Sequence, residues 1–390
     1  FKRMKKNISI FLLFVSLLVF SYQDDYKSFI EGLGLDLEEA QVVTEDRYVN
    51  TVWIIKSKNE SIRKQKSIIL QHGLLDGGFT WLILGEKSLA YKLAEDYGYT
   101  VYLPYIRGSQ FSKSHLDYDT GLNSDYWNFS FDEMAKYDLP AVVNFVKERD
   151  GVKKVDYIGH SQGTLIFFLN YMNDPEYMEK NINKFVAVGT VPNVNHAPHF
   201  LIKLFEKSKI LNFIPVKNFL TLPPEIAAVT VPFCTSKVKG LCETILKLAF
   251  SGLEDTGRID YERLDKTIFM YEPGGTSLQN MKHWIQIYTA KKVQKYDYGS
   301  KLENFIHYGV DHAPAYDLKK MGGYSIPSLM TISDADPFAA PQDTLEFVDN
   351  IDDPNIVEIL SLNNYNHIDY IWADSAVDDV FPKIFKFLNE

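Results

Sequence analysis

The chain has 390 residues, of which 46% are hydrophobic, 14% aromatic and 24% charged. This composition is typical of a folded globular protein and excludes disordered, collagen-like and low-complexity classes. The formal net charge is −10, and no basic block occurs beyond the first six residues, which argues against a nucleic-acid partner. The length allows two or three modules, or one large α/β domain that carries an insertion.

The first 21 residues have the pattern of a secretory signal peptide. Four basic residues within positions 2–6 precede an apolar-leaning run at 8–20, and the small residue Ser21 follows. This run is short for a membrane span, which needs about 20 residues. We predict a signal peptide over residues 1–21, with an uncleaved amino-terminal anchor as the alternative. The mature chain would then enter an oxidising compartment.

Two glycosylation sequons follow the signal. Asn59 lies in a turn rich in Lys and Ser, where a glycan would be accessible. Asn128 lies among aromatic residues, where burial would prevent modification. Both are predicted as acceptors if they are exposed.

Short runs rich in β-branched and aromatic residues alternate with longer helical stretches. Strands are predicted at 51–56, 67–71, 100–104, 154–158, 184–189, 326–332 and 356–360. Helices are predicted at 87–96, 131–149, 164–171 and 380–388. The order strand, helix, strand predicts an α/β fold with a mostly parallel central sheet and helices on both faces. The sequence contains no internal repeat.

A Gly-x-Ser-x-Gly motif, Gly159-His160-Ser161-Gln162-Gly163, follows one predicted strand and precedes a predicted helix. In this context the motif predicts a tight turn that exposes the serine hydroxyl at the carboxyl end of the sheet. The two glycines remove side chains that would collide in such a turn. We predict that Ser161 is a nucleophile, and the alternative is a chance match in a Gly-containing loop.

An oxyanion formed beside this serine needs two or more backbone donors. One is the N–H of Gln162, the residue after the nucleophile. The second should come from the loop after the strand at 67–71, where Gly73 lets the backbone come close and Leu74 offers its N–H.

The segment at 191–324 breaks the alternation. Prolines punctuate short amphipathic pieces, so we predict a mainly helical cap or lid inserted into a core formed by residues 22–190 and 325–390. Cys234 and Cys242, the only cysteines, lie in this insertion, and a disulfide between them fits the oxidising compartment. The alternative is two free buried thiols. No metal site is expected, because two cysteines without paired histidines provide too few ligands.

A serine nucleophile needs a base and an acid that orients the base. After a strand–serine–helix turn of this kind, they follow along the chain in the order serine, acid, histidine. His367 lies in a polar loop after the last predicted strand, and a loop at the carboxyl end of a strand is where a base can reach the serine. We therefore predict His367 as the base. His283 lies in a helical stretch and is predicted to be structural.

The acid is expected after the strand at 326–332, where the loop contains two aspartates. Asp336 is preferred because Pro337 ends the loop rigidly behind it, and Asp334 remains an alternative. Asp343 and Asp369 are predicted to be solvated surface charges.

Three runs resemble the acid lipases, the group that holds gastric lipase and lysosomal acid lipase. They are Gln-His-Gly-Leu-Leu at 71–75, Phe-Ser-Phe-Asp-Glu-Met-Ala-Lys-Tyr-Asp-Leu-Pro at 129–140, and the serine motif at 159–163. Further matches are at 44–46, 107–108, 275–281, 283–284 and 367–372. The resemblance extends from about residue 36 to the end of the chain. It is weakest in the cap and at 333–337, where the family has Gly-Gly-His-Asp-Trp.

This resemblance implies an α/β-hydrolase core with a helical cap and lid. Carried over residue by residue, it implies a triad of Ser161, Asp336 and His367, with Leu74 and Gln162 as oxyanion donors. It also matches the family's paired lid cysteines to Cys234 and Cys242.

The expected function is a secreted or lysosomal-type serine lipase that hydrolyses triacylglycerols or sterol esters through an acyl-enzyme. Such an enzyme works at a lipid–water interface and needs no metal, organic cofactor, colipase or obligate protein partner. The alternatives are a carboxylesterase, a peptidase, an acyltransferase, and a non-catalytic relative that binds lipid.

Overall fold

The structure is a computed structural model that describes residues 25–198, 202–203, 206–207, 209–221, 244, 256–260 and 273–390. The predicted signal peptide, Cys234 and Cys242 lie outside these residues. Among the described residues, no helix combines the length and the apolar character that crossing a bilayer requires.

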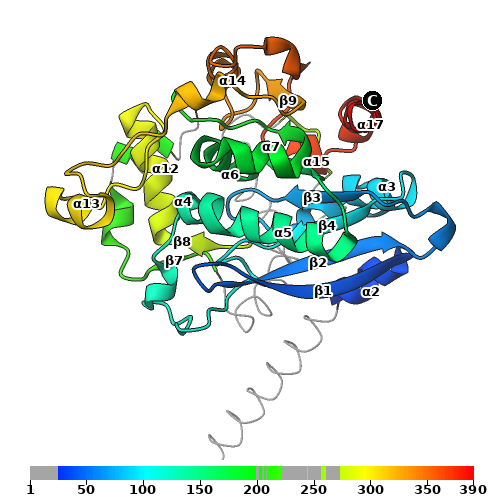
Figure 1. The fold of residues 1–390 in the computed structure, drawn as a ribbon, viewed down its shortest axis with the longest axis horizontal. Helices are drawn as coiled ribbons and strands as arrows, with labels where there is room; N and C mark the ends of the chain where they lie inside the picture. Colours follow the sequence, from blue (N-terminus) through cyan, green and yellow to red (C-terminus); the bar gives the residue numbers. More distant parts are fainter. Residues whose placement is uncertain are drawn as a thin grey trace, which may run out of the picture.

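A twisted sheet of eight strands forms the centre of the molecule (Figure 1), in the order β1-β2-β4-β3-β5-β6-β9-β10. β1 pairs antiparallel with β2, and β2 pairs antiparallel with β4, whereas the remaining pairs are parallel. The sheet is therefore mostly parallel, as predicted. Its strands are β1 (Leu35–Val43), β2 (Val49–Ser57), β3 (Ser67–Gln71), β4 (Thr100–Pro104), β5 (Val155–His160), β6 (Ile182–Val188), β9 (Ser328–Ser333) and β10 (Val357–Leu362).

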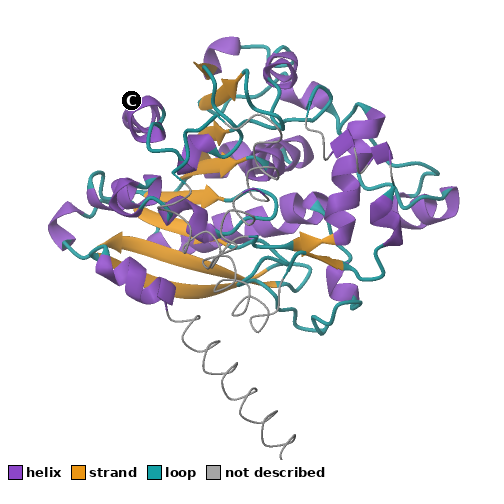
Figure 2. Cartoon of the chain, turned by 180° about the vertical axis from the view of Figure 1, so that it is seen from behind, coloured by secondary structure: helices purple, strands orange, loops and turns teal. Residues whose placement is uncertain are grey.

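Helices cover both faces of this sheet, which Figures 1 and 2 show from opposite sides. One hydrophobic cluster joins Ile69 of β3 to α5, α6, α7 and α14, and a second joins Ile68 and Leu70 to α2, α3, α15 and α17. Successive residues of β3 thus face opposite layers, which explains why a strand buried on both faces reads as a continuous apolar run. The helices are α2 (Asp25–Gly32), α3 (Leu89–Glu95), α5 (Leu139–Asp150), α6 (Gln162–Asn173), α7 (Pro175–Asn181), α14 (Pro341–Val348), α15 (Asp369–Trp372), α16 (Ala376–Asp379) and α17 (Phe381–Asn389).

Between β6 and β9, the elements that lie wholly within the described residues are mostly short. They are η6 (Ile210–Phe213), the two-stranded sheet of β7 (Asn218–Phe219) and β8 (Thr276–Ser277), α12 (Leu278–Ala290), α13 (Lys301–Tyr308) and η7 (Leu318–Met321). The figures place α12 and α13 beside the core, beyond one end of the strands (Figure 1).

The structure contains helices that were not predicted, among them α2, α7 and α14, and two further differences have a clear physical cause. β1 was not expected, because most of its residues are exposed or half-buried and only Leu35 and Val42 are buried, as suits an antiparallel edge strand. The helix predicted at 131–149 consists of α4 (Phe131–Glu133), a π-helical turn η5 (Met134–Asp138) and α5. Pro140, in the first turn of α5, has no N–H to donate to the preceding turn, so regular hydrogen bonding cannot continue through it.

Four loops follow the carboxyl ends of parallel strands. They come after β3, β5, β9 and β10, and they carry Leu74, Ser161, Asp336 and His367. Because the strands run the same way, these loops meet at one edge of the sheet, which is where open α/β sheets bind ligands.

Candidate active site

Ser161 lies between β5 and α6 in a strained turn. Its φ of 53° and ψ of −117° are unusual for a residue with a side chain, and its N–H donates to the carbonyl of Val188 at 3.1 Å. A Cβ on Gly163 would lie 2.6 Å from the carbonyl oxygen of Gln71, and one on Gly159 would lie 2.7 Å from the carbonyl of Gly163. Only glycine fits at both positions, which explains the motif.

Three side chains form a continuous hydrogen-bonded chain. His367 Nε2 lies 2.7 Å from Ser161 Oγ, and His367 Nδ1 lies 2.9 Å from each carboxylate oxygen of Asp336. An ionised carboxylate only accepts hydrogen bonds, so the imidazole proton is on Nδ1 and the lone pair of Nε2 faces the serine hydroxyl. All three residues are buried. The geometry is the one a serine nucleophile, a base and an orienting acid require.

Of the two candidate acids, only Asp336 reaches His367. Its Oδ1 also accepts the backbone N–H groups of Phe338 and Ala339, each at 2.9 Å, which holds the carboxylate in place. Asp334 is exposed, and its Oδ1 accepts the N–H of Asn364 instead.

The loop that carries His367 is fixed from two sides. Asp369 accepts the N–H of Asn366 at 2.7 Å, and His160 Nε2 lies 2.8 Å from the carbonyl oxygen of His367. Burial lowers the pKa of His160 to about 3, so its ring is neutral and Nε2–H donates to that carbonyl. The prediction that Asp369 is a surface charge is wrong, because only 1% of it is exposed. Asp369 bonds to Asn366, three residues earlier in the same loop, and no sequence pattern predicts this contact.

The same prediction is wrong for Asp343. This residue of α14 is fully buried, and its two oxygens accept the N–H and the Nδ1–H of His196 at 3.0 and 2.8 Å. Glu346 Oε1 lies 4.0 Å from His196 Nε2, so these three side chains are close enough to share a cation. The Nδ1 of His196 is already bonded to Asp343, and both His196 and Glu346 are exposed. We assign the group no role in the chemistry.

The loop after β3 lies against the serine. A Cβ on Gly73 would be 3.1 Å from Ser161 Cβ. His72 Nε2 accepts the N–H of Ile106 at 3.2 Å, which leaves the proton on Nδ1 to donate to the carbonyl of Gly73 at 2.9 Å. Burial lowers the pKa of His72, so the ring stays neutral in this arrangement. Leu75 has a φ of 60°, which turns the chain sharply after Leu74.

Leu74 and Gln162 are thus both next to the serine. Among the described residues, none accepts a hydrogen bond from the backbone N–H of either one. The N–H of Gln162 also opens α6, where the helix dipole favours negative charge. Both groups are available to an anion.

An apolar cluster begins at this loop. Leu74 and Leu75 pack against a group of side chains from the segment between β6 and β9, which are Leu211, Ile214, Phe219, Leu278, Met281 and Ile285. Apolar surface therefore adjoins Leu74, one of the two predicted oxyanion donors.

Gln162 has contacts that the sequence did not indicate. Its side-chain oxygen accepts hydrogen bonds from Asn280 Nδ2 at 2.9 Å and from Trp284 Nε1 at 2.8 Å, and both donors come from α12. Both residues lie in the segment 275–284, which resembles the acid lipases. That resemblance alone did not predict a contact with Gln162.

The run at 107–108, which also resembles the acid lipases, has a structural role. Arg107 is fully buried and bridges Asp46 at 2.6 Å to Asp138 at 2.7 Å, with its guanidinium over the ring of Tyr48. These residues tie the loop after β4 to the chain before β2 and to η5. A buried arginine with two carboxylates is well compensated and offers no free group for chemistry.

Both predicted glycosylation residues are exposed. Asn128 is exposed despite its aromatic neighbours, because the turn after η4 (Asp125–Trp127) points it outward between buried Trp127 and Phe129. Asn59 caps the short helix η1 (Glu60–Ile62). Their glycosylation stays a prediction.

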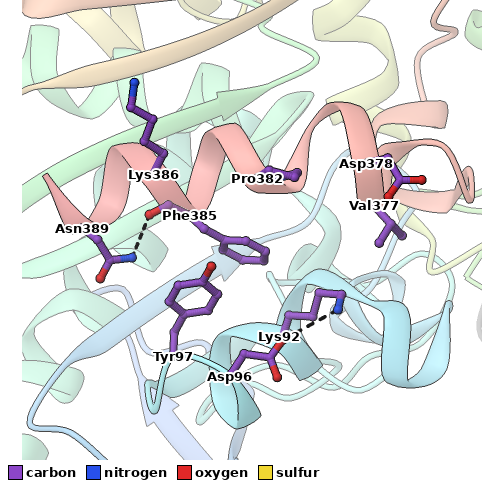
Figure 3. A pocket seen from close by; sticks show the side chains of 9 residues that line it. All are labelled: Lys92, Asp96, Tyr97, Val377, Asp378, Pro382, Phe385, Lys386 and Asn389. Carbon is purple, nitrogen blue, oxygen red and sulfur yellow. Dashed lines mark hydrogen bonds and ion pairs between the residues drawn. The ribbon is translucent and has the colours of Figure 1, made fainter.

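A hollow of about 610 Å³ lies elsewhere, between α3 and α17 (Figure 3). Lys92 pairs there with Asp96 at 3.7 Å, and Tyr97 stacks on Phe385 at 4.4 Å between ring centres. Asn389 Nδ2 donates there to the carbonyl of Phe385 at 2.7 Å. None of the nine residues that line it belongs to the loops of Ser161, Asp336 or His367, so it is separate from the chemistry at the sheet edge.

Comparison with known proteins places the chain among hydrolases. Residues 66–212 match the family described as the alpha/beta hydrolase fold, and residues 26–85 match the partial alpha/beta-hydrolase lipase region. The chain is 34% identical over 373 residues to the gastric triacylglycerol lipase of Mus musculus, covering 92% of this chain and 89% of the relative. It is 33% identical over 364 residues to the lysosomal acid lipase/cholesteryl ester hydrolase of Homo sapiens, covering 92% and 88%.

Solved structures agree on the fold. A carboxylesterase from Bacillus subtilis has a TM-score of 0.54 at 11% identity, covering 95% of this chain and 98% of that one. An esterase from Exiguobacterium antarcticum has a TM-score of 0.54 at 12% identity, covering 90% and 100%. The predicted α/β-hydrolase fold is confirmed.

Proposed function

The chain belongs to the lipase family of α/β-hydrolases that includes the gastric and lysosomal acid lipases, and we propose that it hydrolyses carboxylic esters of neutral lipids. The observation that carries this proposal is the hydrogen-bonded chain from Ser161 through His367 to Asp336. Triacylglycerols and sterol esters are the substrate class, because the relatives are named for hydrolysing them.

The proposed reaction begins when Ser161 Oγ attacks the ester carbonyl carbon. His367 Nε2 takes the hydroxyl proton, and Asp336 stabilises the imidazolium that forms. The N–H groups of Leu74 and Gln162 hold the tetrahedral oxyanion. His367 then gives its proton to the leaving alcohol. Water repeats these steps on the acyl-enzyme and releases the fatty acid.

The apolar cluster beside Leu74 supports an apolar acyl group. Burying a methylene contributes about 0.8 kcal/mol, so a long chain gains more from such a surface than a short one does. We propose that the segment 191–324 is the cap that supplies most of this surface, over a core of residues 22–190 and 325–390.

The proposed setting is a lipid–water interface reached through the secretory pathway, either outside the cell or in a lysosome or digestive vacuole. The apolar amino-terminal run after basic residues supports this setting, and so does the exposure of both sequons.

A substrate panel with one variant tests the proposal. Emulsified long-chain triacylglycerol, a sterol ester and a soluble short-chain nitrophenyl ester are offered to the purified full chain between pH 4 and 8. Ser161→Ala should lower kcat by roughly 10⁴-fold or more on each ester that is turned over, with an unchanged melting temperature. A fluorophosphonate probe should label the peptide that contains Ser161 and no other.

Each contrary result identifies one alternative. Retained hydrolysis in Ser161→Ala would remove the serine from the mechanism. Turnover of the soluble ester alone would make the chain a carboxylesterase. If the folded wild type showed neither turnover nor labelling, the chain would be a lipid-binding relative without catalysis.

A further inference from the structure

One segment of the chain, Gly274 to Trp284, contacts both loops that carry the proposed oxyanion donors. Gly274 N–H donates to the carbonyl of Leu75 at 2.7 Å, directly beside Leu74. Asn280 and Trp284, farther along the same segment, both donate to the side chain of Gln162. The two loops come from different strands, and this segment lies against both.

The contacts to Gln162 fix its side chain in one orientation. Its Oε1 receives two N–H donors, which is the full capacity of an amide oxygen, and its Nε2 faces Met134 Sδ at 3.4 Å. A flipped amide would point its NH₂ group at two other donors. Gln162 is fully buried, so bulk solvent does not reach it to replace a lost partner.

Asn280 is itself held on two sides. Its Oδ1 accepts the N–H of Phe131 at 2.9 Å, and its own N–H is capped by Ser277 Oγ at 2.9 Å. Asn280 is fully buried. The donor that reaches Gln162 is therefore anchored to both α4 and the start of α12, and a side chain locked by such contacts positions its neighbour well.

At the other loop, the contact is close enough to require glycine. A Cβ on Gly274 would lie 2.2 Å from the carbonyl oxygen of Asp76 and 2.7 Å from its carbonyl carbon. Asp76 accepts the N–H of Gly77 at 2.7 Å within the turn that carries Leu74. Any side chain at 274 would displace the backbone of this turn.

We propose that Asn280 and Trp284 are positioning residues for the oxyanion-binding N–H of Gln162, and that Gly274 performs the same task for the Leu74 loop. Among the described residues, no hydrogen bond joins this segment to Ser161 or His367, so we infer that it acts through the two donors. This inference rests on the proposed roles of Leu74 and Gln162. It assigns to a segment outside the core a share in stabilising the transition state.

The test uses Trp284→Phe, which removes the indole N–H and keeps an aromatic ring beside Phe131. An oxyanion contact is made only in the transition state, so the variant should lower kcat about tenfold and leave KM within about twofold. Losing a donor outright costs roughly 10²–10³ in kcat, and a misplaced donor should cost less. The substrate is the soluble nitrophenyl ester, so that binding to an interface does not enter the result.

Gln286→Leu is the matched control on the same helix. Its amide bonds to the backbone of Asp297 at 2.7 and 2.8 Å and does not reach Gln162, so kcat should stay within about twofold. A double-mutant cycle adds Gln162→Met, which deletes the acceptor. Trp284→Phe should cause no further loss in that background, because the two changes remove the same interaction.

Gly274→Ala tests the other loop and keeps the inference falsifiable if Trp284→Phe does not fold. It should also lower kcat by about tenfold or more with little change in KM. Gly323→Ala is its control, because a Cβ there meets nothing within 4 Å.

The inference is overturned if Trp284→Phe and Gly274→Ala match their controls, if the loss is in KM alone, or if the losses of Trp284→Phe and Gln162→Met are additive. Its failure is distinguishable from failure of the proposed function. An active wild type with an inactive Ser161→Ala supports the function whatever these variants do.

Discussion

Ser161 and Ser130 each lie within hydrogen-bonding distance of a histidine that has an aspartate nearby. In the first set, Ser161 Oγ is 2.7 Å from His367 Nε2. In the second, Ser130 Oγ is 3.0 Å from His283 Nδ1, and Asp132 Oδ2 is 3.9 Å from the same nitrogen. By residue type and distance alone, the two regions look alike.

The ring nitrogens separate them. His367 has its serine on Nε2 and its carboxylate on Nδ1, so the aspartate holds the proton on the nitrogen that faces away from the serine. His283 has both on the Nδ1 side, and its Nε2 donates to the carbonyl of Gln294 at 2.9 Å. Ser130 is completely buried and caps α4, whereas 9% of Ser161 remains exposed, so only Ser161 can be reached. A serine and a histidine therefore need a carboxylate on the opposite nitrogen and an accessible hydroxyl before they indicate catalysis.

Replacing the two histidines should give the largest contrast. His367→Gln should lower kcat by roughly 10⁴-fold or more, because no group remains to take the serine proton. His283→Gln should keep kcat within about tenfold and lower the melting temperature instead, because it disturbs a buried hydrogen-bonded residue. Nitrophenyl ester kinetics and circular dichroism measure the two effects. Equal losses of activity would contradict the difference between the regions.

The two aspartates in one loop give the next contrast. Asp336→Asn leaves a neutral amide beside His367 Nδ1, which favours the wrong tautomer, and should lower kcat by about 10⁴-fold. Asp334→Asn changes an exposed residue and should leave kcat within about twofold. The same ester assay decides between them, and the reverse order would move the acid to Asp334.

The sequence predicts an element well where burial of the element produces a clear pattern of apolar residues. The strands at 67–71 and 100–104 have the predicted bounds because both faces are buried, which produces an unbroken apolar run. The edge strand β1 has no such run. Strand order places Ser161 and His367 at one edge of the sheet, but it cannot separate Asp334 from Asp336, which are two residues apart in an irregular loop.

The support of Gln162 shows what local patterns omit. Asn280 and Trp284 lie 118 and 122 residues along the chain from Gln162. Their sequence suggests an ordinary amphipathic helix, and only the packing of α12 on the core brings their donors to the amide oxygen. Hydrogen bonds between distant side chains carry no period or spacing that a single sequence can display.

The pH dependence of stability gives the smallest effect and the sharpest test of the second region. Burial raises the pKa of Asp132 to about 6, so between about pH 4 and 6 the folded chain holds a proton there that the unfolded chain lacks. This carboxyl therefore makes the free energy of unfolding fall as pH rises through that window. Burial also raises the pKa of Glu133, with Asp132 adding to it, and acts in the same direction.

His283 opposes them. Burial lowers its pKa to about 4, so between about pH 4 and 6.5 the unfolded chain binds the extra proton and stability rises with pH. Within this cluster the contribution of His283 to the slope therefore opposes that of the two carboxyl groups. Asp132→Asn should make the melting temperature rise more steeply with pH, and His283→Gln should change the slope in the opposite direction, by an amount that corresponds to at most about 1.4 kcal/mol per pH unit for each proton. Melting curves at pH 4.5, 5.5 and 6.5 measure the slopes, with Asp334→Asn as the exposed control. Parallel slopes in all four proteins would show that this buried cluster does not titrate, and that its hydrogen bonds alone distinguish it from the serine site.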